Sequence, residues 1–346
     1  MMRVQKILIF VLFQVAAGSA LEAQDLHFSQ WFNEPLLTNP ANTGFIPDAD
    51  YRIGANYRNQ WSSVMSAPYK TMSIWGDAQV FRNRIQSGWL GVGGSILHDV
   101  AGASSLSTTE VYMSVAYHQM LGYSSLLSLG FNTGWVNKQI NSTNLKFPDQ
   151  FDGKFFDSNV PTGVVIDNPN INYFDMQVGM NYAYFPDKNT YMNAGVSVQH
   201  INGPQETFFN DDPVGFSNKI PMRFTGFING SFKTSNWVIL NPMAYYTLQA
   251  DAHEMVAGLN LQYNLSGDGD QQLVGGLYFR PGDALIPMVG FIYKNIHLMF
   301  SFDVTTSSLK QYNNGNGAWE FAVMRPGYYS DYNGDRNQSL CPTFKN

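Results

Sequence analysis

The chain has 346 residues, of which 13% are charged and 15% are aromatic, and its formal net charge is −6. Soluble domains usually carry about 25% charged residues, so this composition argues against an ordinary soluble domain, although the mean hydropathy is only −0.19. The acidic balance leaves no basic field for nucleic acid, which excludes a nucleic-acid partner.

Residues 1–23 have the parts of a cleavable export signal. A basic start at Arg3 is followed by an apolar core over residues 7–17 and by a small-residue exit. We expect cleavage after Ala20 or Ala23, and the sequence leaves both positions open. The apolar core is too short to cross a bilayer, and no later run of about 18 apolar residues follows. We therefore expect an exported protein without a membrane-spanning helix.

Residues 24–50 show no regular pattern. Pro35, Pro40 and Pro47 interrupt any helix or strand in this segment. We expect a nonregular leader with two possible placements. It either folds into the domain that follows, as a plug, or stays in the periplasm as a docking segment.

Apolar and small polar residues alternate with a period of two over residues 51–325. In residues 173–185, for example, Phe174 and Met176 fall on one face while Gln177 falls on the other. In a closed barrel the apolar face meets lipid and the polar face meets the lumen, and ring closure satisfies every backbone amide. The predicted fold class is an all-β, transmembrane, antiparallel β-barrel in the cell outer membrane, in contact with its lipid.

We predict about fourteen strands, because each candidate is close to the roughly 9 to 11 residues that a tilted membrane strand needs and an even number is typical of bacterial barrels. Aromatic residues at the strand ends, among them Trp89, Trp135, Tyr191 and Trp237, are predicted to form interfacial girdles. The predicted strands cover residues 51–59, 70–81, 89–98, 106–118, 125–138, 173–185, 190–200, 221–233, 237–249, 253–265, 271–280, 284–294, 296–304 and 318–325.

The connections between these strands alternate in length. Short ones such as 186–189 and 234–236 lie at one end of the barrel, and the two longest, 139–172 and 201–220, lie at the other. Outer-membrane barrels have short periplasmic turns and longer outer loops. We therefore expect the long loops outside, both termini in the periplasm, and a periplasmic tail over residues 326–346.

No pattern in the chain indicates catalysis, a cofactor or a metal site. The G-x-S-x-G, H-E-x-x-H and P-loop motifs are absent, and the six histidines are scattered. The stretch from Asp331 begins like a calcium loop, but Arg336 stands where glycine is required and Pro342 where glutamate is required. Cys341, the only cysteine, cannot form an internal disulfide. The sequence leaves it as a solvated thiol, which we favour, or as a partner contact.

Seventeen residues spread over the mature chain carry a family resemblance. They are Phe28, Ser29, Gln30, Asn39, Pro40, Gly44, Tyr57, Arg58, Gln60, Trp61, Asp99, Gly102, Ser308, Leu309, Glu320, Cys341 and Pro342. The pair Ser308 and Leu309 ends a motif that starts at Phe302 and includes Asp303. With these motifs the chain resembles the PorP/SprF family of outer-membrane proteins of Bacteroidetes.

The resemblance implies a role in type IX secretion and gliding motility. Its expected partners are a large secreted surface protein, such as a gliding adhesin, and components of the secretion system. It implies no catalytic residues, so the motif residues become candidate docking residues. We expect a non-enzymatic accessory or anchor that supports secretion or surface retention of the partner.

The alternative is a passive channel for small or hydrophobic solutes. The inward faces are rich in Gly, Ser, Asn and Gln, which favours a closed lumen over a pore lined by charges.

Overall fold

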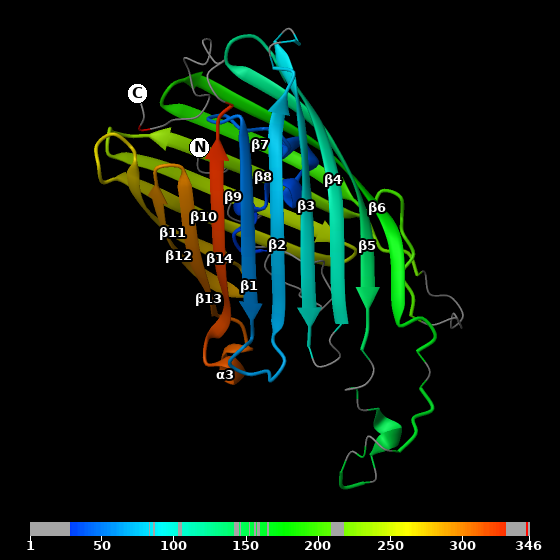
Figure 1. Cartoon of the computed structure of the whole chain (residues 1–346). Coiled ribbons are helices and arrows are strands. Elements are labelled where there is room, and N and C mark those ends of the chain that lie inside the picture. The colour runs from blue at the N-terminus through cyan, green and yellow to red at the C-terminus, as the bar shows by residue number, and fades with distance from the viewer. Residues whose placement is uncertain are drawn as a thin grey trace, which may run out of the picture.

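The chain folds into a closed β-barrel in the computed structural model (Figure 1). Fourteen antiparallel strands follow one another in sequence order around the barrel, and β1 pairs with β14 to close it. The prediction of an all-β barrel of about fourteen strands is confirmed. The structure describes residue 344 and residues 28–329 except 83, 86, 103–105, 142–144, 146, 152, 156, 158–159, 165 and 209–217.

The strand boundaries agree with the predicted ranges to within three residues. In chain order the strands are β1 Tyr51–Gln60, β2 Tyr69–Val80, β3 Gly88–Ala101, β4 Leu106–Met120, β5 Ser125–Gln139, β6 Asn170–Asp187, β7 Thr190–Gln199, β8 Arg223–Lys233, β9 Val238–Gln249, β10 Ala252–Asn264, β11 Gln271–Arg280, β12 Ala284–Tyr293, β13 Ile296–Thr305 and β14 Asn316–Gly327. The short helix α3, Lys310–Asn313, lies between β13 and β14.

The last strand continues two residues beyond its predicted end. Gly327 lies opposite Tyr51 in the sheet, and its carbonyl accepts a hydrogen bond of 2.9 Å from the amide of Asp50. Tyr329 then donates its amide to Asp50 Oδ2 at 3.0 Å and its hydroxyl to the carbonyl of Gln79 at 3.0 Å. The chain therefore stays attached to the barrel wall through Tyr329.

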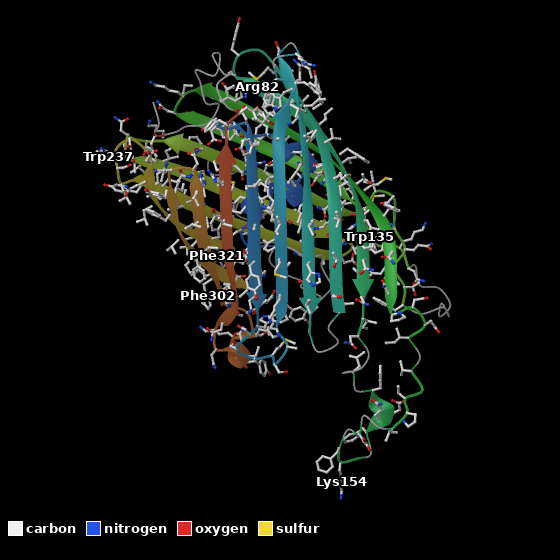
Figure 2. The ribbon with its side chains drawn as sticks, viewed as in Figure 1. Arg82, Trp135, Lys154, Trp237, Phe302 and Phe321 are labelled. Atoms are coloured by element: carbon white, nitrogen blue, oxygen red, sulfur yellow. The ribbon has the colours of Figure 1, made fainter. Side chains whose placement is uncertain are left out.

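The outer face of the barrel is apolar. The side chains of Ile74, Met113 and Phe174 are 67%, 74% and 67% exposed, and Figure 2 shows Trp135 and Trp237 projecting from the wall. Such an apolar surface is stable only against lipid. Of the predicted girdle residues, however, Trp89 and Tyr191 are buried inside the barrel, so the girdle prediction is wrong for them. In the described part of the chain, no helix is long and apolar enough to cross a membrane.

The two ends of the barrel differ. The end at which β1 begins and β14 finishes carries the short connections, and we call it the turn end. The opposite end, called here the loop end, carries the long connections 140–169 and 200–222. Figure 1 shows the first of these projecting far beyond the barrel.

We expect the loop end to face the outside of the cell. A peptide tag inserted after Lys154, which lies at the tip of the long loop in Figure 2, should bind antibody on intact cells. A tag after Ser235, in the turn between β8 and β9, should bind antibody only after the outer membrane is permeabilised. Labelling of the Ser235 tag alone on intact cells would mean that the barrel has the opposite orientation.

The interior has two chemically different sides. Inward residues of β1 to β7 are mainly polar, whereas those of β8 to β14 include a packed apolar cluster with Val256, Val274, Ile286 and Met288. Trp31 joins this cluster from the N-terminal segment. The interior is therefore less uniformly small and polar than the sequence suggested, because one side of the wall buries its apolar side chains against a segment inside the lumen.

Candidate functional site

Residues 28–50, called here the plug segment, lie inside the barrel. The segment appears in blue behind β1 and β2 in Figure 1. It contains three single-turn helices, η1 Trp31–Asn33, α2 Pro35–Thr38 and η2 Pro40–Asn42. Proline starts both α2 and η2, where its missing amide costs no helical hydrogen bond, and it prevents longer helices.

Asn39 fixes the middle of the plug segment to the wall. Its side-chain amide donates to the carbonyls of Met180 in β6 and Val196 in β7, both at 3.0 Å. Its Oδ1 accepts from the amide of Ala41 at 2.8 Å and so caps η2. Ser197 adds a hydrogen bond of 2.8 Å to the carbonyl of Thr38. One buried asparagine thus joins two strands to the plug.

Glycines in the wall allow the plug backbone to approach closely. A Cβ atom on Gly130 of β5 would lie 2.2 Å from the carbonyl carbon of Pro40, and one on Gly91 of β3 would lie 1.9 Å from the carbonyl oxygen of Thr43. Real Cβ contacts are never this short, so larger residues would displace the plug.

Gly44 turns the plug segment toward the wall near the turn end. Its φ of +66° lies in the left-handed region that favours glycine. Its amide donates to Asp77 Oδ2 at 2.7 Å, and its carbonyl accepts from Trp89 Nε1 at 2.9 Å. This second contact explains why Trp89 faces inward rather than toward the membrane interface.

The start of the plug segment is held by a buried charged cluster that we call the latch. Its members are Ser29, Arg58, Glu254, Arg280, Asp303 and Glu320, all at most 9% exposed. The carboxylate of Glu320 accepts hydrogen bonds from the amides of Ser29, at 2.6 Å, and Gln30, at 2.9 Å. It also pairs with Arg58, which the register places directly opposite it. Glu320 therefore joins β1, β14 and the plug.

The hydroxyl of Ser29 lies at the centre of the latch. It donates to Asp303 Oδ2 at 2.8 Å and accepts from Arg58 at 2.8 Å and from Arg280 at 2.7 Å. One donor and two acceptor positions are all that a serine hydroxyl offers. Arg280 also lies 3.4 Å from a carboxylate oxygen of Glu254. Positive and negative side chains are thus neutralised together around a single plug residue.

Five of the seventeen motif residues meet at the latch. Ser29, Gln30, Arg58 and Glu320 contact one another as described, and Gln60 accepts from Arg58 Nε at 3.4 Å. They come from three segments of the chain that are distant in sequence. The motif residues at the two ends of the chain therefore form one structural unit.

The other motif residues lie elsewhere. Phe28, Asn39, Pro40 and Gly44 belong to the plug, and Asp99 accepts from Thr71 Oγ1 at 2.6 Å in the wall. Tyr57 lies on the outer face, with its ring 5.2 Å from that of Trp319. Four lie at the loop end and two lie outside the described residues. The four are Trp61, Gly102, Ser308 and Leu309, and the two are Cys341 and Pro342.

Two latch residues, Arg280 and Glu254, belong to none of the motifs. Asp303 lay within a motif but was not singled out. In a chain with so few charges, an isolated charge at an inward strand position is the signal that points to them. The interior was predicted to offer little charge, which is wrong for the latch, because these charges neutralise one another instead of lining a pore.

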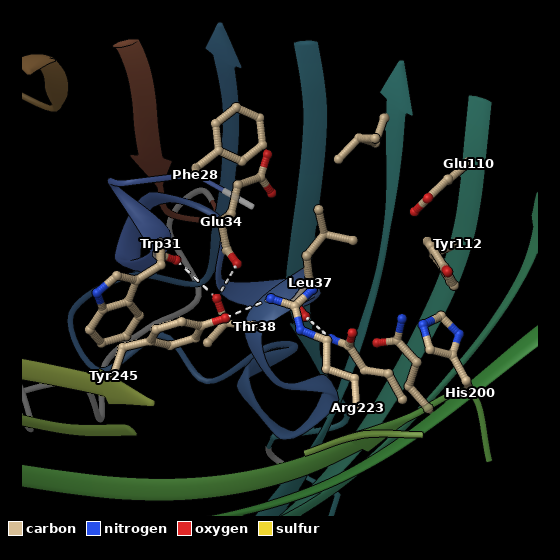
Figure 3. A pocket seen from close by; sticks show the side chains of 13 residues that line it. Phe28, Trp31, Glu34, Leu37, Thr38, Glu110, Tyr112, His200, Arg223 and Tyr245 are labelled. Carbon is tan, nitrogen blue, oxygen red and sulfur yellow. Dashed lines mark hydrogen bonds between the residues drawn. The ribbon is translucent and has the colours of Figure 1, made fainter. Parts of the chain in front are cut away.

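A cavity of about 60 Å³ lies between the plug segment and the loop end (Figure 3). Glu110 and Arg223 lie near the loop-end starts of β4 and β8, and Gln199 ends β7 at the same end. The plug supplies its floor, and Figure 3 shows the carboxylate of Glu34 beside the ring of Phe28. The lining residues are Phe28, Trp31, Glu34, Leu37, Thr38, Leu97, Glu110, Tyr112, Gln177, Gln199, His200, Arg223 and Tyr245.

Glu34 is the unusual member of this lining. It is 2% exposed, and neither carboxylate oxygen has a hydrogen-bond partner within the protein. The nearby amide of Asn56 donates instead to the carbonyl of Asn33 at 2.9 Å. Burial raises the pKa of Glu34 from 4.5 to about 8, against a smaller lowering by the Asn56 side chain.

We expect docking of the plug segment to depend on pH through Glu34. A raised pKa means that the docked state favours the protonated acid, so docking is strongest below about pH 4.5 and weakens as the pH rises through about 8, by a total on the order of 4 kcal/mol. Hydrogen exchange of residues 31–38, corrected for intrinsic rates, should show this slope. Glu34→Gln should remove it and Glu206→Gln, at the loop-end rim, should not. Equal slopes in all three proteins would contradict the expectation.

Metal binding has no support in the described ranges. They contain no group of three or more His, Cys, Asp or Glu side chains placed to hold an ion. The calcium-like stretch from Asp331 lies outside the described residues.

A closed, lipid-facing barrel whose lumen holds a latched plug defines an outer-membrane type of β-barrel protein. Residues 20–324 match the family described as Type IX secretion system membrane protein PorP/SprF, and the chain belongs to this family. The resemblance noted in the sequence is therefore confirmed. The protein is an outer-membrane β-barrel of the type IX secretion system.

Solved structures share the fold at low sequence identity. A Pseudomonas aeruginosa FadL homologue is 7% identical with a TM-score of 0.50, over 83% of this chain and 92% of that chain. The Ralstonia pickettii toluene transporter TbuX is 12% identical with a TM-score of 0.47, over 85% of this chain and 93% of that one. At these identities the likeness concerns the fold alone. No curated protein matches the chain significantly.

Proposed function

We propose that this protein is a non-enzymatic accessory or anchor of the type IX secretion system, which supports the secretion or surface retention of a large partner protein. The observation that carries the proposal is the latched plug segment. Its backbone is bonded to both β14 and β6–β7 across the lumen, through Glu320 and Asn39. A barrel built for passive diffusion needs a continuous water path, which such a plug obstructs.

Burial divides the candidate docking residues into two groups. Ser29, Gln30, Arg58 and Glu320 are nearly inaccessible, so we assign them to holding the plug rather than to touching a partner. The loop-end residues Trp61, Gly102, Ser308 and Leu309 are partly or fully exposed. We assign partner docking to this second group, on the side from which a surface protein approaches.

Deletion of the gene should remove one large protein, or a small set, from the cell surface and leave outer-membrane permeability unchanged. A chain truncated after Tyr329 should rescue this loss less well than the full chain, while the barrel still inserts, because Tyr329 is the last of the residues that pack on the wall. Quantitative surface proteomics of the three strains measures the effect. Unchanged surface proteins together with reduced uptake of small solutes would favour the passive channel instead.

A further inference from the structure

The cavity above the plug has the features of a binding site that is open to ligands from the loop end. About 60 Å³ is enough space for about four water-sized groups. Its floor combines the carboxylate of Glu34 with the rings of Phe28 and Trp31 (Figure 3). Because a buried carboxylate without a partner is costly, this site favours a group that supplies positive charge and hydrogen-bond donors.

The lining selects among the possible cations. A divalent metal requires several oxygen or nitrogen ligands, and the described residues offer no such group here. An alkylammonium group has three N–H donors for the two free oxygens of Glu34. It is also attracted to the faces of aromatic rings, such as those of Phe28 and Trp31. Its size is compatible with the cavity, whereas a bulky cation has no room.

We propose that the cavity binds a primary alkylammonium group, with the Glu34 carboxylate as its counter-ion. The group belongs either to a free small amine or to a lysine side chain of a polypeptide that enters from the loop end. Binding of the free amine does not rest on the anchoring function proposed above. The two proposals can therefore fail separately.

The other charged groups around the cavity leave Glu34 as the natural counter-ion. Arg223 donates to the hydroxyl of Tyr245 at 2.8 Å and to Thr247 at 2.9 Å, and His200 lies 2.9 Å from a carboxylate oxygen of Asp175. Glu110 lies across the cavity from Glu34 in Figure 3 and has an interaction of its own. Only Glu34 has both oxygens without a protein partner among these groups.

Calorimetry of the purified full-length mature barrel in detergent, titrated with propylammonium, tests the proposal. The ammonium replaces the proton that Glu34 carries, so binding at about pH 7 should release up to one proton, seen as a dependence of the heat on the buffer. Glu34→Gln should weaken binding by about 10- to 100-fold, as expected for loss of charged hydrogen bonds, and should abolish the proton release. Glu110→Gln is the matched control and should keep most of the affinity.

The source of the ammonium group is decided by two further titrations. A blocked Gly-Lys-Gly peptide and its Nζ-acetylated form are added in place of propylammonium. Binding of propylammonium alone supports a free amine, and binding of the lysine peptide but not of its acetylated form supports a lysine side chain. Absence of binding by both amines, or equal binding to the wild type and Glu34→Gln, would overturn the proposal.

Discussion

Glu320→Ala is expected to free the start of the plug segment from the barrel wall. The substitution removes the acceptor of the Ser29 and Gln30 amides and leaves Arg58 without its facing partner. Loss of one member of a buried ion pair costs about 3 to 5 kcal/mol. Amide exchange of residues 28–33 should therefore accelerate by at least about 100-fold, since each 1.36 kcal/mol corresponds to a factor of ten.

Hydrogen exchange followed by mass spectrometry measures this effect on the purified barrel. Glu206→Ala is the matched control, because Glu206 also pairs with a cation, Lys138, at 2.6 Å, but both partners are partly exposed. An exposed pair contributes only about 0 to 1 kcal/mol, so exchange in the plug should stay unchanged. Equal exchange in Glu320→Ala and in the wild type would show that the latch does not hold the plug.

Gly130→Val is expected to expel the middle of the plug segment and to open the lumen to ions. A Cβ atom at this position would lie 2.2 Å from the carbonyl carbon of Pro40 and 2.3 Å from the amide nitrogen of Ala41. Both are backbone atoms next to Asn39, which is fixed to β6 and β7, so the plug has no small adjustment that relieves the overlap. The wild type should conduct poorly in planar bilayers, and the variant should show stable channels.

Gly275→Val provides the control for this experiment. Gly275 is also a strand glycine, in β11, but a Cβ atom there meets nothing within 4 Å. It should therefore leave conductance unchanged, and both variants should retain the β-sheet circular dichroism of the wild type. Low conductance in folded Gly130→Val would mean that the lumen stays closed without the plug in its observed position.

The strand pattern could be predicted from the sequence because it is local. The period-two alternation assigns each residue a face, whatever strand lies beside it. For this reason Phe174 and Met176 could be placed on the lipid side, and the lengths of the connections could be read in chain order. The same reasoning failed for Trp89, because an aromatic residue at a strand end is equally stable at the membrane interface and against a carbonyl inside the lumen.

Only the tertiary structure decided where the plug segment lies and what holds it. The sequence left residues 24–50 inside the barrel or outside it, since three prolines exclude regular structure without choosing a location. The latch joins Ser29 to Arg58, Arg280, Asp303 and Glu320 across most of the chain, and no local pattern records that these side chains share one point in space. Closure of the barrel brings β1 beside β14, and this closure turns motifs at opposite ends of the sequence into a single buried cluster.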